Sequence, residues 1–444
     1  MDGRTFRALA AAAAACVVLS SCGGGGKDDG GSAGSPAAPA DVTGTITVLT
    51  NRTDLNQDGT LKKYAASFNQ VYPKVQVSFQ AITDYEGEVK TRMNTENYGD
   101  VLLIPPSISS ADFPKFFAPL GEATDLDKKY NWIDSGTTDG SLTGQVYGLA
   151  TFGNANGFVY NKRIWKQAGI TSYPTTPEQF VTDLQAIKAK GGAIPYYTNY
   201  HDGWPVQGWS GALGSPGCDP AANTAMASDQ TPFAAGKGPG DIYRLLYTVV
   251  QNKLTEPDPT TTNWENSKSL IGTGKVATMW LGSWAMVQMQ DAARKAGADP
   301  ADIGFMPYPA QKDGKFCAVT SRDYNQAINV HSENKAAARA WLDWFTDKSG
   351  FATDQGSIPP LKGAPLPATL ADYKAAGVTY IELDQSRSGT VSKIDNESEV
   401  GFFSAPNTAQ RLVDVARGAA NGDVDSVLGD LNKKWADGIS TVGG

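Results

Sequence analysis

The stretch that decides the fold begins with Thr45-Ile46-Thr47-Val48-Leu49-Thr50 and ends with Asp100-Val101-Leu102-Leu103-Ile104. The first run is rich in β-branched residues and predicts a strand that breaks at Asn51-Arg52, while the second predicts a buried strand stopped by Pro105-Pro106. Between them, the apolar spacing predicts a helix, a strand and a helix, over residues 61–71, 75–79 and 84–95. This β-α-β-α-β order predicts a parallel sheet covered by helices.

The rest of the chain continues as an α/β protein. Thr176-Pro177-Glu178-Gln179 opens a helix with an N-cap threonine and a proline in the first turn, and Gly191-Gly192 ends it after Lys190. Residues 276–280 form a strand-like run. Further helices are expected over residues 332–345, 407–419 and 424–439.

The N-terminus has the pattern of an export signal. Arg4 and Arg7 precede an apolar run over residues 8–19, which is shorter than the about 20 residues that span a bilayer. Leu19-Ser20-Ser21-Cys22 resembles the bacterial lipoprotein pattern, in which the chain is cut before the cysteine and its thiol receives palmitate-type acyl chains. We therefore expect a signal peptide over residues 1–21 and a protein lipid-anchored to the outer side of a bacterial cell membrane. The alternative is an uncleaved signal anchor.

Residues 22–41 are mostly Gly, Ser, Ala and Pro and predict a flexible tether. Of the four cysteines, Cys16 leaves with the signal and Cys22 is lipidated. Cys218 and Cys317 then remain in an oxidising compartment, where we expect a disulfide; two free buried thiols are the alternative. Closing a loop of about 100 residues stabilises a protein by roughly 4 to 5 kcal/mol on the chain-entropy model.

The composition excludes several classes of function. The 444 residues include 38 Lys and Arg against 46 Asp and Glu, a formal charge of -8 that argues against nucleic-acid binding. With only two histidines, His201 and His331, a soft-metal cage has few possible members. We expect no cofactor and no resident metal.

Two strings resemble site motifs but lack essential members. Gly272-Thr273-Gly274-Lys275 lacks the four-residue spacer of a phosphate-binding loop, and the chain has no Gly-x-Ser-x-Gly nucleophile motif. Residues 54–59 match the first half of a calcium loop, but Ala65 stands where the bidentate carboxylate belongs. An Asp-Gly turn is the preferred interpretation, and a Ca²⁺ site supported from elsewhere is the alternative.

Three tryptophans lie in loop-like sequence. Trp204, Trp209 and Trp284 sit among Gly, Pro, Asp and Gln, where one ring face can stay accessible, unlike Trp341 and Trp344 in a periodic helix. A sugar site needs flat rings for C–H faces and polar groups for hydroxyls. The polar candidates are Asn51, Arg52, Asp54, His201 and Asp202. Packing of each ring in a core, and a solvated loop for each polar group, are the alternatives.

Several strings in a fixed order resemble the extracellular solute-binding proteins, family 1, of carbohydrate ABC importers. They are Gln145-Val146-Tyr147-Gly148-Leu149-Ala150, residues 157–162, residues 174–180, residues 274–279 with Gly282-Ser283-Trp284-Ala285, and residues 303–309. The resemblance covers nearly all of residues 42–444.

The resemblance implies a type II periplasmic-binding fold, with two α/β lobes joined by a hinge. Lobe 1 would comprise residues 42–152 and 320–356, and lobe 2 residues 153–319 and 357–444. The chain would cross near Gly153, residues 319–321 and residues 356–360.

The resemblance also implies where the ligand lies. Its site would be between the lobes, with Trp284 as a stacking ring and Asp100 either in the cleft or capping a helix. The full set of expected ligand-binding residues is Asn51, Arg52, Asp54, Asp100, His201, Asp202, Trp204, Trp209, Trp284, Arg322, Tyr324 and Asn325.

The function that the resemblance implies is capture of a sugar or oligosaccharide and delivery to the transmembrane subunits of an ABC permease, without catalysis. We expect a monomer. The alternatives are a binding protein for another polar solute such as a polyol or a glycerol phosphate, a secreted glycoside hydrolase, and an adhesion or scaffold lipoprotein. Arg52 and Arg322 are cations that could bind an anionic ligand, so this alternative stays open. The sequence shows no matched pair of carboxylates, which a hydrolase would need.

Overall fold

A computed structural model describes residues 38–443. The predicted signal peptide, the expected lipidation site Cys22 and residues 22–37 of the predicted tether lie outside this range. Within residues 38–443, no helix combines the length and the hydropathy that crossing a bilayer requires.

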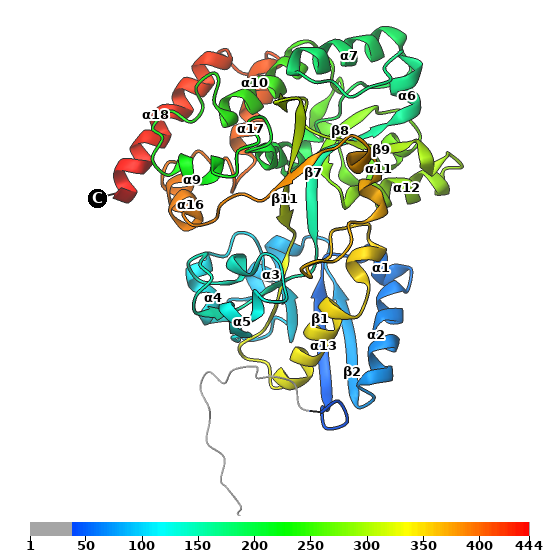
Figure 1. Ribbon diagram of the computed structural model, residues 1–444, viewed down its shortest axis with the longest axis vertical. Helices are drawn as coiled ribbons and strands as arrows, with labels where there is room; N and C mark the ends of the chain where they lie inside the picture. Colours follow the sequence, from blue (N-terminus) through cyan, green and yellow to red (C-terminus); the bar gives the residue numbers. More distant parts are fainter. Residues whose placement is uncertain (1–37, 444) are drawn as a thin grey trace, which may run out of the picture. The chain divides into compact units, whose positions relative to one another are not determined.

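One sheet is five-stranded, and the body built around it is called lobe 1 (Figure 1). Its order is β2-β1-β3-β12-β6. β1 pairs in parallel with β2 and β3, which confirms the predicted parallel arrangement, but β12 runs antiparallel to both β3 and β6. The strands are β1 Gly44–Thr50, β2 Val75–Ala81, β3 Val101–Leu103, β6 Leu149–Ala150 and β12 Asn325–Ile328.

Helices cover both faces of this sheet because its strands alternate apolar side chains between two cores. Ile46 and Val48 of β1 join one core with Phe68 and Trp341, while Leu49 joins the other with residues that include Phe117. The other elements of lobe 1 are α1 Thr53–Gln57, α2 Thr60–Val71, α3 Tyr85–Arg92, α4 Phe113–Phe116, β4 Gly121–Glu122, α5 Ala123–Leu126, β5 Gln145–Val146, α13 Lys335–Asp347 and α14 Phe351–Asp354.

The second sheet is six-stranded, and the body around it is called lobe 2. Its long strand β7 pairs antiparallel with β8, β9 and β11, whereas β13 runs parallel to β11, so this sheet is mainly antiparallel. The strands are β7 Gly153–Asn161, β8 Thr278–Gly282, β9 Ile303–Met306, β10 Gln311–Lys312, β11 Lys315–Arg322 and β13 Thr379–Ile381.

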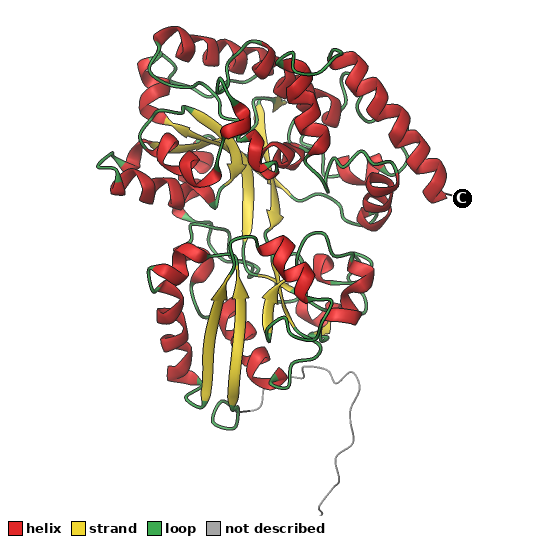
Figure 2. Ribbon diagram, turned by 180° about the vertical axis from the view of Figure 1, so that it is seen from behind, coloured by secondary structure: helices red, strands yellow, loops and turns green. Residues whose placement is uncertain are grey.

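Lobe 2 also has a core on each side of its sheet, as Figure 2 shows by the helices around the strands. Phe158 points to one core and the adjacent Val159 to the other. The α-helices are α6 Lys162–Gln167, α7 Pro177–Lys190, α8 Trp204–Gln207, α9 Ala222–Met226, α10 Gly238–Gln251, α11 Trp264–Gly272, α12 Ala285–Lys295, α15 Ala371–Ala375, α16 Ser388–Glu397, α17 Asn407–Ala416 and α18 Val424–Gly443.

The chain passes between the two sheets at three places. β6 belongs to the first sheet and β7 to the second; β11 belongs to the second and β12 to the first. After α14, Phe351 still packs in a core of lobe 1, whereas Ile358 packs in a core of lobe 2. Because β12 enters lobe 1 from lobe 2, it runs opposite to β3.

Cys218 and Cys317 form a disulfide, as expected. It ties the loop before α9 to β11, two segments of lobe 2 that are 99 residues apart in the chain.

Most predicted elements appear, with differences at their ends. The helices expected over residues 61–71 and 177–190 are present as α2 and α7. The helix expected from Ser332 begins only at Lys335, because the Ser332 hydroxyl accepts a hydrogen bond from the Asn334 N–H in a turn before it. The helix expected to end at Ala419 ends at Ala416.

Candidate functional site

Three tryptophans of lobe 2 form a cluster. Trp204 begins α8, Trp264 begins α11 and Trp284 caps α12. Their ring centroids lie 5.1 Å (Trp204 to Trp264), 5.4 Å (Trp264 to Trp284) and 6.1 Å (Trp204 to Trp284) apart. Trp204 is 40% exposed, and the other two are partly buried. The rings meet at angles of 42° to 71°, so the cluster presents edges and faces in several directions.

Trp284 lies where the two lobes meet. Its ring packs against a core of lobe 1 as well as a core of lobe 2. A Cβ at Gly282 would lie 2.6 Å from both Cδ1 and Nε1 of Trp284, so the glycine is what allows the ring to fold back over the end of β8. The Gly-x-Trp spacing therefore has a steric reason.

Trp209 does not join this cluster, so its expected accessible face is absent. It is 0% exposed, stacks on Trp280 at 5.8 Å and donates its Nε1–H to the Tyr196 hydroxyl at 2.8 Å. Trp204 begins α8, whereas Trp209 lies in the 3-10 helix Gly208–Ala212 that follows it, and the two side chains point to different sides. Trp204 thus faces outward and Trp209 faces the core.

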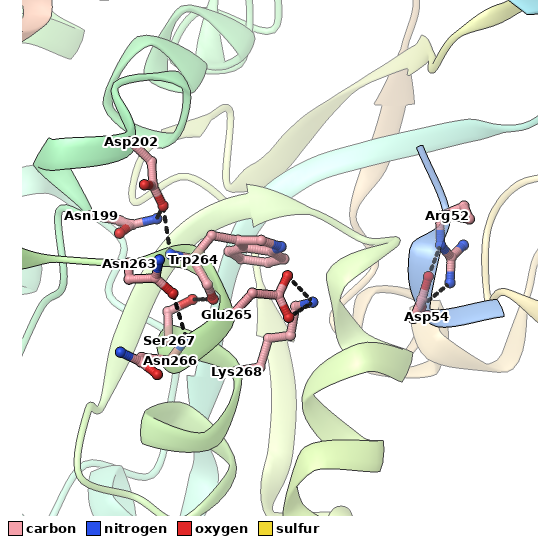
Figure 3. Close-up of polar contacts among 10 residues, drawn as sticks. All are labelled: Arg52, Asp54, Asn199, Asp202, Asn263, Trp264, Glu265, Asn266, Ser267 and Lys268. Carbon is pink, nitrogen blue, oxygen red and sulfur yellow. Dashed lines mark hydrogen bonds and ion pairs between the residues drawn. The ribbon is translucent and has the colours of Figure 1, made fainter. Parts of the chain in front are cut away.

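Asp202 fixes the start of the helix that carries Trp264 (Figure 3). Its Oδ2 accepts hydrogen bonds from the Trp264 backbone N–H at 2.5 Å and from the Asn199 Nδ2 at 3.0 Å. The neighbouring His201 is exposed, and its backbone N–H donates to the Thr262 hydroxyl at 2.9 Å. Asp202 therefore holds Trp264 of the tryptophan cluster in place. The His201 side chain is exposed to solvent.

Glu256 supports the same loop from beneath. It is 5% exposed and accepts hydrogen bonds from the Thr198 backbone N–H, at 3.1 and 2.9 Å to its two oxygens, and from the Thr198 hydroxyl. Burial raises the pKa of Glu256, and the hydrogen bonds from Thr198 oppose that shift. This carboxylate anchors the segment that carries Asn199, His201 and Asp202.

Lobe 1 contributes an ion pair, Arg52 with Asp54, to the candidate site, and this pair lies directly after β1. Arg52 donates from Nε to Asp54 Oδ1 at 2.9 Å and from Nη2 to Asp54 Oδ2 at 2.7 Å. The Arg52 side chain is 17% exposed and that of Asp54 45% exposed. Asn51 precedes the pair and is partly buried. The charges of the pair cancel, but Asp54 keeps an exposed face that can accept further hydrogen bonds.

The second arginine of the expected site also has acidic neighbours. Part of Arg322 reaches solvent, yet desolvation by the surrounding protein lowers its pKa, and the charges of Asp134 and Asp323 oppose that shift. Tyr324 donates its hydroxyl to Glu86, and the Asn325 Nδ2 donates to the Ser135 carbonyl at 3.0 Å. Asn325 is 4% exposed, so its side chain stabilises the interior of lobe 1 and is not accessible to a ligand.

Asp100 does not lie with Arg52. It accepts a hydrogen bond from the Thr47 backbone N–H at 2.7 Å and from the Ser332 hydroxyl at 2.5 Å, which ties the middle of β1 to the turn before α13. β1 and β3 run in parallel, so a residue before β3 cannot reach the edge where β1 ends. Neither the cleft nor the helix-capping interpretation describes this role.

The Asp54–Gly59 segment forms most of α1 and the turn that follows it. Gly59 has a φ of 82°, and Asp58 accepts a hydrogen bond from the Thr60 N–H at 2.8 Å. Across residues 38–443, no group of three His, Cys, Asp or Glu side chains is placed to hold a metal ion.

Three residues of this region, Trp264, Glu256 and Lys268, are not among the site residues expected from the sequence. Trp264 follows a Pro- and Thr-rich loop and an N-cap asparagine, so the criterion that selected Trp204 could have selected it too. Glu256 and Lys268 gave no local signal, because their roles depend on contacts across the fold.

The two sheets, the three crossings and the tryptophan cluster describe a two-lobed binding protein, and the comparisons with known proteins agree. The chain belongs to the family described as bacterial extracellular solute-binding protein, whose model matches residues 53–350.

Two solved structures from Bifidobacterium animalis subsp. lactis ATCC27673 are similar over 94% of this chain and 100% of theirs. BlMnBP1, a binding protein of an ABC transporter in complex with mannobiose, has a TM-score of 0.85 and 32% identity. BlMnBP2, a manno-oligosaccharide-specific solute-binding protein in complex with mannotriose, has a TM-score of 0.86 and 31% identity. The multiple sugar-binding protein of Streptococcus mutans is 23% identical over 303 residues, 65% of this chain and 68% of that protein.

Proposed function

We propose that this protein captures a neutral oligosaccharide containing mannose between its two lobes and delivers it to an ABC permease. The observation that carries the proposal is the cluster of Trp204, Trp264 and Trp284 beside the junction of the lobes. Indole rings match the C–H faces of sugar rings, and the hydrogen-bonding groups of Asp54 and His201 match their hydroxyls. The mannobiose and mannotriose held by the two Bifidobacterium proteins support the choice of sugar.

The charges favour a neutral ligand over an anionic one. Arg52 is paired with Asp54, and Arg322 lies in the field of Asp134 and Asp323. An anion such as a glycerol phosphate would have to compete with these carboxylates for both cations. A polyhydroxylated neutral molecule does not compete with either carboxylate for these cations, because its hydroxyls both donate and accept hydrogen bonds.

The ligand would stabilise a closed arrangement of the lobes by contacting both walls at once, and no bond is made or broken. The three crossings act as the hinge, with the lobe boundaries expected from the sequence. We further propose that the protein acts as a monomer, held at the outer face of the cell membrane by a lipid on Cys22. The tether would keep it near its permease.

Titration calorimetry of the purified protein tests the proposal. Mannobiose and mannotriose should bind, while glycerol 3-phosphate and raffinose should bind at least about 100-fold more weakly. Saccharides recovered after incubation should be unchanged. Binding of the phosphate alone would contradict the proposed ligand, and release of shorter sugars would contradict a role without catalysis.

A further inference from the structure

Two ion pairs, each made of one cation and one anion, face each other beside the tryptophan cluster. One pair belongs to each lobe. Arg52 and Asp54 form the pair of lobe 1. On lobe 2, the Lys268 Nζ donates to Glu265 Oε1 at 2.8 Å and Oε2 at 2.9 Å. Figure 3 shows the Lys268 ammonium on the side of α11 that faces the Arg52–Asp54 pair.

Lys268 is held in this direction by the cluster itself. Its Nζ lies 5.1 Å from the centroid of the Trp264 ring, and its side chain is only 15% exposed. The stem of the lysine therefore lies against protein, and its charge is kept near the ring. A flexible surface lysine would not hold one position in this way.

The charge of Lys268 acts on Asp54 across the lobes. Burial alone would raise the pKa of Asp54, but the hydrogen bonds and charge of Arg52, together with the charge of Lys268, hold this pKa below its usual value. Lys268 thus stabilises the Asp54 carboxylate although no hydrogen bond joins them in this structure. Both carboxylates have room for a second cation, since the Asp54 side chain is 45% exposed and that of Glu265 72% exposed.

We propose that these four residues form a latch that exchanges partners when the lobes close: Lys268 bonds to Asp54 and Arg52 to Glu265, across the bound ligand. Each lobe contributes one cation and one anion, so the exchange leaves no charge unpaired. The latch rests on the proposed function, because closure follows capture of a ligand. Its effect is to slow the release of that ligand.

The test measures ligand dissociation by stopped-flow tryptophan fluorescence, with mannotriose as the probe. Lys268→Gln should raise the dissociation rate about 5-fold at low ionic strength, as expected from the loss of the one latch pair that contains Lys268. The association rate should change less, because the latch forms after encounter. Raising the salt concentration should speed dissociation from the wild-type protein more than from the Lys268→Gln variant, in which only the Arg52–Glu265 pair of the latch remains to be screened.

Two variants separate the charge from the packing. Lys268→Arg keeps the cation over Trp264 and should restore slow, salt-dependent dissociation. Lys128→Gln removes the cation of an exposed pair within lobe 1, Lys128 with Asp125 at 2.7 Å, and should leave dissociation unchanged. In a double-mutant cycle, Asp54→Asn and Lys268→Gln should be coupled by at least 3-fold in the dissociation rate.

The outcomes distinguish the two proposals. If the wild-type protein binds mannotriose but its dissociation is insensitive to salt and to Lys268→Gln, the latch is wrong and the proposed function stands. If Lys268→Arg behaves like Lys268→Gln, the lysine acts through packing and the latch is also wrong. If the wild-type protein binds no saccharide, both proposals fall.

Discussion

The two lobes contribute different chemistry to the same site. Lobe 2 supplies three indole rings, fixed by Asp202 and by the buried Glu256. Lobe 1 supplies an ion pair on a short helix after β1, held by two hydrogen bonds. Apolar area contributes most of the free energy of binding, whereas charged groups contribute more to specificity and rates. We infer that lobe 2 provides affinity and lobe 1 provides selectivity and closure.

The largest predicted effect concerns the stability of lobe 2, which carries the Cys218–Cys317 disulfide. Replacing both cysteines by serine should lower the free energy of unfolding of lobe 2 by about 4 kcal/mol, because the loop it closes spans about 100 residues. Chemical denaturation followed by tryptophan fluorescence measures this. The dissociation constant at 20 °C should stay within about 2-fold of the wild-type value, since the disulfide does not contact the tryptophan cluster. A large loss of affinity in the folded variant would show that the disulfide shapes the site.

The next effect tests the assignment of affinity to lobe 2. Trp284→Ala should weaken mannotriose binding by about 100-fold, or about 3 kcal/mol, because it removes a ring that touches both lobes. Titration calorimetry measures the change. Trp435→Phe is the matched control, since Trp435 is 0% exposed in a core of lobe 2 and its change should affect stability only. Equal affinities of the wild-type protein and the Trp284→Ala variant would remove Trp284 from the site.

The corresponding change on lobe 1 should be smaller. Arg52→Gln should weaken binding by about 10-fold, because the Asp54 carboxylate loses the two charge-assisted hydrogen bonds that hold it in position. Its selectivity for neutral over anionic saccharides should increase, because a carboxylate at Asp54 is left without its cation. A loss as large as that of Trp284→Ala would reverse the assignment of roles to the two lobes.

The smallest predicted effect is a pH dependence of the stability of lobe 2. It arises at Asp183 in α7, away from the candidate site. Burial raises the pKa of Asp183 to about 6, and its Oδ2 has no hydrogen-bond partner among the described residues. A raised carboxyl pKa means that Asp183 destabilises the folded state progressively as the pH rises from about 4 to about 6. Because the residue is partly exposed, we expect only about 1 kcal/mol after solvent screening.

Asp183→Asn should therefore stabilise the protein at pH 7.5 and leave its stability unchanged at pH 4. Thermal unfolding at the two pH values measures the difference. An equal shift of the unfolding midpoint at both pH values would contradict a charge effect.

The sequence predicted the strand and helix order of lobe 1 well, because β1, α2 and β2 carry strong local periodicity. It did not predict that β12 runs antiparallel to β3, since β12 follows a segment of lobe 2 that is far away in the chain. Among the site residues, Trp204, Trp284, Arg52 and Asp54 could be selected from their loop context. Trp209 could not be distinguished from Trp204, because only the folded chain shows that one of them packs against Trp280.

The sequence by itself determined the residue chemistry of this protein: the aromatic and polar groups, the pair of cysteines and the alternation of strands and helices. These depend on local composition and spacing, which can be read along the chain. Only the tertiary structure decided that Trp264 joins Trp204 and Trp284, that Asp100 serves the interior of lobe 1, and that Lys268 faces Asp54. Those outcomes depend on segments that are distant in the chain meeting in space, and no local pattern encodes such a meeting.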